Sequence, residues 1–314
     1  AATDELAGLM ITLPSTLGLF DPAITEICDT VHRAGGLVYG DGANMNALLG
    51  RVKLRALGFD VVHLNLHKTF TTPHGGGGPG AGPVCTTDQL APYLAAPIVT
   101  KNGGAYAFST PENSIGKLSG FHGNFGVLVR AYTYIRTLGG AGILSISGNA
   151  VLNANYMMNA LRGVYHLPYD RTCMHEAGFS ADWQKERGSS GLEIAKRLLD
   201  YGFHAPTMYF PLIVHEALMI EPTESESKVE IDRFCDAMIA IREEIARIES
   251  GEWPKDSNPL VMAPHTMADI TEEIWDRPYS REQAVFPSEA VRDAKYWPAV
   301  NRVDNVFGDR NLIC

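Results

Sequence analysis

The 314-residue sequence contains 45% hydrophobic and 20% charged residues, a balance typical of globular proteins, and it is long enough for two domains. Its formal net charge of −10 argues against a general nucleic-acid or anionic-membrane partner, since either would require a basic surface. No apolar run approaches the roughly 20 residues needed to cross a bilayer, and the odd number of scattered cysteines argues against a disulfide framework or a structural zinc site.

The first ninety residues alternate between the apolar patterns of strands and helices. We predict strands at 8–14, 37–41 and 59–66 and helices at 21–33 and 45–57. Gly35, Gly36 and Gly58 follow the two helices and are typical helix-ending residues. This alternation predicts parallel strands joined by right-handed crossovers.

Polar residues follow each of the three predicted strands. Thr16, Asp41 and Lys68 stand at or just after the strand ends. In open α/β sheets, ligands bind at the carboxyl ends of the strands. We therefore expect a hydroxyl, a carboxylate and an amine to share one edge of the sheet.

The second half of the chain has a different pattern. We predict helices at 124–138 and 143–161, strands at 203–213 and 217–220, and a long amphipathic helix that a capping box, Thr223 and Glu226, opens and Gly251 ends. The proline-rich tail from Trp253 is expected to wrap over the surface. This pattern predicts a large α/β domain at 1–162 and a smaller α+β domain at 163–314. Because so little sequence precedes the first strand, we expect the chain to be part of a longer protein.

The pairing of Asp41 with Lys68 matches the needs of pyridoxal phosphate (PLP). That cofactor requires a lysine for a Schiff base, a carboxylate for the pyridine nitrogen and donors for the phosphate. Ala43 is small enough to lie against one face of the ring. Either charged residue alone is more simply read as a solvated surface group, but the two together at one sheet edge favour the cofactor.

Three further features have two interpretations each. His67 either orients the cofactor linkage or only satisfies its neighbours. Thr16 either contacts the phenolic oxygen of the cofactor or caps the following helix. The glycine-rich loop at 75–80 either brings backbone amides to a phosphate or only provides positive φ angles. The remaining histidines, among them His175 and His265, show no metal-ligand spacing.

Six segments resemble the glycine cleavage system P-protein family, the glycine decarboxylases. The segment at 64–80, LNLHKTFTTPHGGGGPG, is similar to the family's PLP-lysine region, and 40–47, GDGANMNA, to its pyridinium-aspartate region. The segments 200–207, 221–226, 263–266 and 304–312 resemble its C-terminal blocks in the family's order. Residues 16–20, TLGLF, look closest to the second subunit of the two-subunit bacterial form.

The resemblance implies the fold of a PLP-dependent transferase of fold type I (aspartate-aminotransferase-like), with a mainly parallel sheet in the large domain. It implies Lys68 as the Schiff-base lysine, with Asp41, Ala43, His67 and Thr16 as cofactor contacts. The implied reaction decarboxylates glycine and transfers the aminomethyl group to the lipoyl arm of the H-protein.

The resemblance also implies an assembly and a location. The chain would need a missing N-terminal half or first subunit, in a dimer or heterotetramer. It would reside in the bacterial cytoplasm, or in the mitochondrial matrix of a eukaryote, and residues 1–5 show no signal peptide. Two alternatives stay open: another fold-type-I decarboxylase or aminotransferase, and a fragment that is catalytically incomplete by itself.

Overall fold

The computed structural model describes residues 5–74, 80–118 and 120–313, which form two compact units. The units comprise Ala1–Val151 and Leu152–Cys314, so they divide within the helix α4 (Phe125–Leu161). The sequence analysis placed this boundary after residue 162, just beyond the end of the same helix. Each unit has its own cluster of buried apolar residues.

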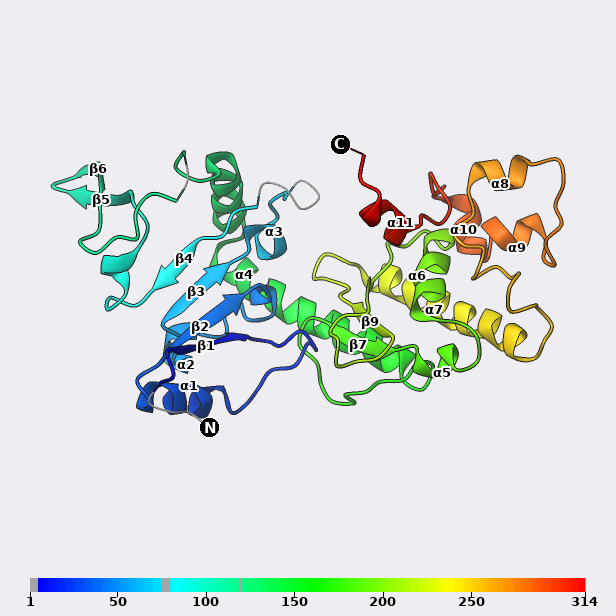
Figure 1. The fold of residues 1–314 in the computed structure, drawn as a ribbon, viewed down its shortest axis with the longest axis horizontal. Coiled ribbons are helices and arrows are strands. Elements are labelled where there is room, and N and C mark those ends of the chain that lie inside the picture. The colour runs from blue at the N-terminus through cyan, green and yellow to red at the C-terminus, as the bar shows by residue number, and fades with distance from the viewer. Residues whose placement is uncertain (1–4, 75–79, 119, 314) are drawn as a thin grey trace. The chain divides into compact units, whose positions relative to one another are not determined.

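The first unit is built on a four-stranded sheet with the order β1–β2–β3–β4 (Figure 1). The strands β1 (Gly8–Thr12), β2 (Leu37–Gly42) and β3 (Val61–Leu64) are parallel, and α1 (Ile24–Arg33) crosses between the first two, as the sequence predicted. The fourth strand, β4 (Val84–Thr86), is antiparallel to β3. Its three residues are too few to show the alternation that identifies a strand in a sequence.

The two faces of this sheet are buried to different degrees. On one face, Val38 packs with Ile24, Cys28 and Val31 of α1 in an apolar core. Along β2 the opposite face carries the half-buried Tyr39 and Asp41. The face that carries the Asp41 carboxylate is therefore accessible, while the other face holds the strands in place.

The predicted single helix at 45–57 is wrong. The segment forms a 3₁₀ turn, η1 (Met45–Ala47), and one short helix, α2 (Leu54–Leu57). Between them Gly50 has a φ of +70°, a left-handed conformation that interrupts a right-handed helix. The apolar residues of η1 are buried nonetheless, so their helix-like spacing reflects packing and not one continuous helix.

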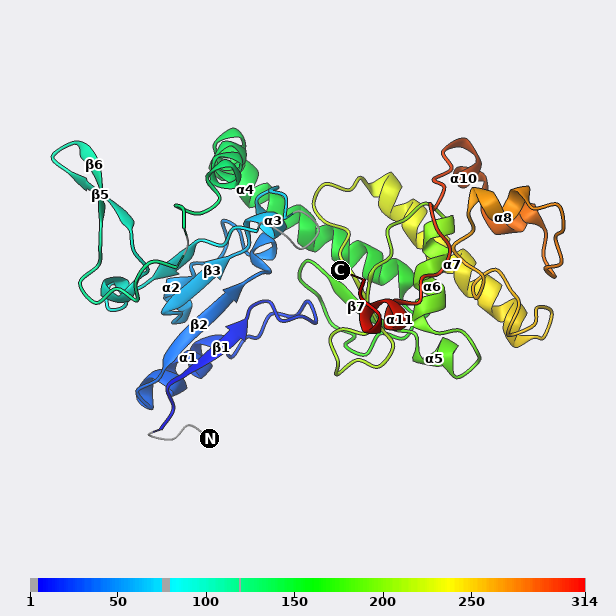
Figure 2. The same cartoon turned by 45° about the horizontal axis from the view of Figure 1, so that its top comes forward.

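A hairpin and a long helix complete the first unit. After η2 (Ala91–Tyr93), β5 (Ile98–Asn102) and β6 (Ala105–Ser109) form a separate two-stranded antiparallel sheet, which extends away from the β1–β4 sheet (Figure 2). The two predicted helices at 124–138 and 143–161 are the two parts of α4. Gly139, with a φ of 61° and a ψ of −175°, breaks the helical backbone between them.

The second unit contains a three-stranded antiparallel sheet with the order β7–β9–β8. Its strands are β7 (Ala177–Ser180), β8 (Thr207–Met208) and β9 (Ala217–Ile220). The predicted strand at 217–220 is confirmed, whereas the one predicted at 203–213 shrinks to two residues. Pro206 and Pro211 offer no amide hydrogen for a ladder, and Tyr209 turns the chain with a φ of 58°.

Helices α6 (Gly191–Asp200) and α7 (Lys228–Glu249) supply much of the second core, and the short α5 (Asp182–Lys185) precedes them. The long helix was predicted, but its proposed cap was wrong. Ser227 accepts a hydrogen bond from the backbone N–H of Glu230 at 3.2 Å, whereas Thr223 has a φ of 58°, outside the extended conformation of an N-cap. Gly251, with a φ of 78°, follows the helix as expected.

The tail beyond residue 252 is more deeply packed than the sequence suggested. It forms the short helices α8 (Met267–Thr271), α9 (Arg281–Val285), α10 (Glu289–Asp293) and α11 (Asn305–Arg310). Trp253 is 3% exposed and Leu260 is fully buried, so a tail that only wraps over the surface is wrong for this part of the chain.

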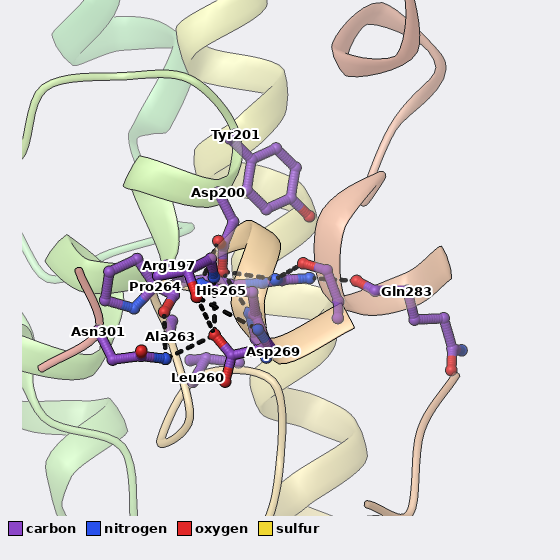
Figure 3. A network of polar contacts seen from close by, with 12 residues as sticks. Arg197, Asp200, Tyr201, Leu260, Ala263, Pro264, His265, Asp269, Gln283 and Asn301 are labelled. Atoms are coloured by element: carbon purple, nitrogen blue, oxygen red, sulfur yellow. Dashed lines mark hydrogen bonds and ion pairs between the residues drawn. The ribbon is translucent and has the colours of Figure 1, made fainter. Parts of the chain in front are cut away.

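A buried polar network joins this tail to α6 and α7 (Figure 3). The Arg197 guanidinium donates to Asp200 at 2.9 Å and to both carboxylate oxygens of Glu244 at 2.9 and 2.7 Å. His265 Nδ1 lies 2.8 Å from Asp200 Oδ2, and its Nε2 lies 3.0 Å from the Tyr279 hydroxyl. His265 is thus a structural core residue, and burial lowers its pKa.

Two whole-chain expectations can be compared with the described residues. Cys28, Cys85, Cys173 and Cys235 are free thiols, while Cys314 lies outside the described part. No helix within the described ranges is long and apolar enough to span a membrane.

Candidate functional site

The Asp41 carboxylate lies near the carboxyl end of β2 and is held by contacts from two sides. The backbone N–H of Ala43 donates to Asp41 Oδ1 at 2.9 Å, and the Thr12 hydroxyl donates to Oδ2 at 3.3 Å. The side chain of Asp41 is 23% exposed, so it is partly desolvated yet open to a ligand. The role predicted for Ala43 was to lie against a ring, and the structure adds a second one, since its amide orients the carboxylate.

His63 also contacts Asp41, and the sequence analysis missed it. His63 Nε2 lies 3.2 Å from Asp41 Oδ1, and its Nδ1 lies 2.9 Å from the Tyr39 hydroxyl. Strand register explains the contact, because Thr12 pairs with Asp41 and Asp41 pairs with His63 across three parallel strands. Tyr39 stands two residues before Asp41 and therefore shares its face of the sheet.

The glycines around Asp41 are required by close packing between strands. A Cβ on Gly42 would lie 2.0 Å from the backbone oxygen of His63, and one on Gly40 would lie 2.8 Å from the Phe59 ring. No side chain fits at Gly42 without separating β2 from β3. The Gly-Asp-Gly sequence thus lets the two strands approach closely enough to bring His63 to Asp41.

Lys68 lies just beyond the end of β3, in the short helix α3 (Leu66–Thr69) (Figure 1). The prediction that the strand continues to residue 66 is wrong, because Asn65 turns the chain and its carbonyl accepts from the backbone N–H of Lys68 at 3.1 Å. Leu66 and Phe70 are buried on either side and anchor the segment, while Lys68 is exposed. The amine is therefore available on a fixed backbone.

His67 is partly buried beside Lys68. Its ring makes an edge contact with His74, with 4.9 Å between centroids. Burial, and then the charges of His74 and Lys68, lower the pKa of His67, which favours the neutral imidazole. Its Nδ1 is buried and has no hydrogen-bond partner among the described residues. Both interpretations of His67 remain open, and the unpaired nitrogen leaves capacity for a ligand.

Two buried hydroxyls on the same segment are also unpaired. Thr69 and Thr72 bury their Oγ1 atoms with no hydrogen-bond partner in the described part of the chain. A buried polar group without a partner costs free energy of about 1–3 kcal/mol, which a polar ligand offsets. The unpaired hydroxyls, the Lys68 amine and the hydrogen-bond-accepting Asp41 carboxylate are the kinds of groups that suit PLP. Of the predicted glycine loop, residues 75–79 lie outside the described residues.

The structure does not place Thr16 at the end of a strand. β1 ends at Thr12, because Pro14 has no amide hydrogen with which to continue the ladder. The threonine hydroxyl at the end of β1 belongs to Thr12, and it contacts Asp41. Thr16 lies in a turn closed by the backbone N–H of Ser15 donating to the Leu19 carbonyl at 2.9 Å. Neither is it an N-cap, since α1 begins at Ile24.

A second cluster of titratable groups occurs in the second unit. His175, Glu176 and Glu221 place one candidate ligand atom each within 4.8 Å of one another. The antiparallel pairing of Ala177 with Ile220 brings these segments together. His175 and Glu176 are buried, and His175 Nε2 lies 3.6 Å from Glu176 Oε1. The sequence separation of Glu221 from the other two concealed this cluster.

Comparison with known proteins relates nearly the whole chain to one family. The model of the glycine dehydrogenase C-terminal domain matches residues 146–265. Curated glycine dehydrogenases (decarboxylating) of Photobacterium profundum and Vibrio campbellii are 53% and 51% identical over 99% of the chain. The chain spans 32% of the length of these relatives, about a third.

Solved structures show the same fold. A glycine decarboxylase (P-protein) of the glycine cleavage system, in inhibitor-bound form, matches with a TM-score of 0.63 at 16% identity, over 76% of this chain and 56% of that one. A cysteine desulfurase from Thermococcus onnurineus matches with a TM-score of 0.57 at 14% identity, over 74% and 59%. The chain therefore shares the fold of these two enzymes, and the expected α/β fold class is confirmed.

Proposed function

We propose that this chain, which is similar over 99% of its length to about a third of glycine dehydrogenase (decarboxylating), carries the lysine and the aspartate that hold PLP in a glycine decarboxylase. The supporting observation is the joint position of two side chains. The Asp41 carboxylate lies near the end of β2, and the Lys68 amine follows the end of the neighbouring parallel strand β3. Both side chains are accessible, and buried neighbouring residues hold the backbone of each segment in place.

Each residue has a distinct task in this proposal. The Lys68 amine forms the covalent link to the cofactor aldehyde. The Asp41 carboxylate accepts the hydrogen bond of the pyridine nitrogen, and the small Ala43 leaves room for one face of the ring. Thr69 and Thr72 donate their unpaired hydroxyls to polar cofactor atoms, and the neutral His67 lies beside the linkage. When bound, PLP supplies the electron sink that makes loss of carbon dioxide from an amino acid feasible.

The substrate and partners follow from the similarity. We propose glycine as the amino acid and the lipoylated H-protein as the acceptor of the aminomethyl group. We further propose that the remaining two thirds of the relatives' length, in the same chain or as a separate subunit, completes the site. The share of its relatives that the chain covers, 32%, supports this second proposal, in which the chain is inactive by itself.

Borohydride trapping tests the assignment of the lysine. The chain is incubated with PLP, reduced, digested and analysed by mass spectrometry, alongside Lys68→Ala and the control Lys53→Ala, which removes another exposed lysine of the same unit. We expect one adduct, on Lys68, that only the first substitution abolishes. An adduct that persists in Lys68→Ala would show that the lysine is wrong.

Absent labelling is resolved by adding the missing portion of the relatives' length. Adduct formation on Lys68 after that addition would show that this chain is an incomplete half of the site. Labelling that remains absent or scattered would refute the proposed function.

A further inference from the structure

The two oxygens of the Asp41 carboxylate have different numbers of polar neighbours. Oδ1 lies within hydrogen-bond distance of two groups, the Ala43 amide at 2.9 Å and His63 Nε2 at 3.2 Å. Oδ2 accepts from the Thr12 hydroxyl alone among the described residues. Since a carboxylate oxygen has two lone-pair directions, Oδ2 keeps one for a ligand. The contacts of Oδ1 therefore decide where Oδ2 points.

The neighbours of His63 select one tautomer of its imidazole. Nε2 faces two oxygen acceptors, Asp41 Oδ1 at 3.2 Å and the Asn65 side-chain oxygen at 3.2 Å, so this nitrogen carries the hydrogen. Nδ1 faces the Tyr39 hydroxyl at 2.9 Å and accepts its hydrogen when the imidazole is neutral. The Tyr39 hydroxyl therefore holds the His63 ring, whose Nε2–H donates to the Asn65 side chain and lies 3.2 Å from Asp41 Oδ1.

This approach of His63 acts on the Asp41 carboxylate. The Nε2–H dipole of a ring held by Tyr39 and Asn65 attracts Oδ1, which favours one orientation of Asp41 in a partly desolvated setting. The exposed fractions of 21% for the His63 side chain and 23% for that of Asp41 show this partial desolvation. Because Thr12, Asp41 and His63 stand in one register row, the orientation is built into the pairing of three strands.

We propose that His63 is a positioning residue, which with Tyr39 behind it orients the Asp41 carboxylate so that Oδ2 holds the pyridine nitrogen of PLP. The proposal rests on the proposed function, because Asp41 must be the partner of that nitrogen. It goes further in assigning roles to two residues that do not touch the cofactor.

The same unit offers a matched control. His32 Nε2 lies 2.8 Å from Asp60 Oδ2, so it forms a second histidine–aspartate pair. Asp60 accepts a hydrogen bond from the backbone N–H of Val38, which lies four residues before Gly42 at the end of β2. His32→Leu removes this pair from the same unit but leaves the contacts of Asp41 in place.

The experiment compares His63→Leu, His63→Gln, Tyr39→Phe and His32→Leu with the unsubstituted chain. PLP labelled with ¹⁵N is bound, together with the missing portion of the relatives' length where uptake requires it. Three quantities are measured: the ¹⁵N chemical shift of the pyridine nitrogen, the Kd for PLP, and the borohydride-trapped adduct on Lys68. The ¹⁵N shift reports the hydrogen bond of that nitrogen, which a purely structural role would not move.

We expect His63→Leu to keep the Lys68 adduct, to move the ¹⁵N signal toward that of an unprotonated pyridine, and to weaken PLP binding about tenfold, as for loss of one hydrogen bond to a charged group. Tyr39→Phe should change the ¹⁵N signal and the Kd for PLP in the same direction, but by less. His63→Gln, whose amide can still donate, should recover part of the effect, and His32→Leu should leave the signal unchanged.

An unchanged ¹⁵N signal and Kd in His63→Leu would overturn this inference while leaving the proposed function intact. The same shift in His32→Leu would also overturn it, since the cause would then be a general loss of stability. If the unsubstituted chain formed no adduct on Lys68 even with the missing portion of the relatives' length added, the proposed function and this inference would both be refuted.

Discussion

The buried carboxylate of Asp200 offers the sharpest test of what holds the second unit together. Asp200 is fully buried, and the two oxygens of its side chain serve three donors (Figure 3). Oδ1 accepts from the backbone N–H of His265 at 2.7 Å, while Oδ2 accepts from Arg197 at 2.9 Å and contacts His265 Nδ1 at 2.8 Å. We therefore consider Asp200→Asn, which keeps the shape of the side chain but removes its charge.

The substitution also replaces one acceptor with a donor. Whichever way the new amide is oriented, its NH₂ group faces at least one N–H group of Arg197 or His265, so hydrogen bonds are lost as well as charge. Removing one partner from a buried ion pair costs about 3–5 kcal/mol. Glu244 still neutralises Arg197, so we expect the lower part of this range. That loss is a large fraction of a typical domain stability of about 5–15 kcal/mol.

Urea unfolding followed by tryptophan fluorescence measures this loss in the relevant unit. All four tryptophans, Trp183, Trp253, Trp275 and Trp297, belong to the second unit, so the signal reports its unfolding. Asp170→Asn is the matched control, because Asp170 pairs with Arg162 at 2.7 Å on the surface, where the two side chains are 55% and 48% exposed. Exposed pairs contribute only about 0–1 kcal/mol.

The expected result is a loss for Asp200→Asn that exceeds the loss for the control by at least about 2 kcal/mol. Equal losses in the two variants would refute the reasoning, since burial would then add nothing to the value of the pair. A midpoint that stays unchanged for Asp200→Asn would refute it more directly.

Three further outcomes are expected from packing and titration. Leu218→Ala, in the fully buried centre of β9, should cost about 2–5 kcal/mol in the same urea assay, whereas Leu212→Ala, at 85% exposure, should stay within about 0.5 kcal/mol. Gly42→Ala places a methyl group 2.0 Å from a backbone oxygen of β3 and should greatly increase hydrogen exchange in β2 and β3, whereas Gly126→Ala, with open space around its Cβ, should not. For Asp269, burial raises the pKa, but hydrogen bonds outweigh burial and lower the pKa to about 2. The resulting stabilisation is present above about pH 4 and should disappear as the pH falls to about 2. Asp269→Asn should therefore make the urea midpoint depend less on pH over that window. An equally steep pH profile in that variant would contradict the assignment.

The sequence predicted the elements whose periodicity is long or regular. The alternation in the first ninety residues predicted three parallel strands and α1, and the apolar stripe of α7 predicted its buried face and its end before Gly251. It failed where single residues override a pattern. Gly50 interrupts the helix predicted at 45–57, and Asn65 ends β3 before the predicted residue 66. A single interrupting residue does not change the hydrophobic periodicity of the surrounding segment, so an analysis of that periodicity does not detect it.

The chemical candidates were predicted more completely than their surroundings. Lys68 and Asp41 are recognisable because an amine and a carboxylate follow neighbouring strands, and the structure places both near the same end of the sheet. The position of Thr16 at a strand end was wrong, because the sequence does not show where Pro14 stops the pairing of β1. The last residue of a strand depends on its register with the neighbouring strand.

The sequence by itself determined the α/β fold class, the alternation of parallel strands with helices in the first ninety residues, and the identity of the lysine and aspartate proposed to hold the cofactor. Only the tertiary structure decided that Thr12, Asp41 and His63 form one row, and that Asp200 joins the tail to α6. The physical reason is the range of the interactions. Periodicity and helix ends arise between residues a few positions apart, whereas a hydrogen bond across strands or between a helix and a distant tail exists only once burial has fixed the register and packing of segments far apart in the chain.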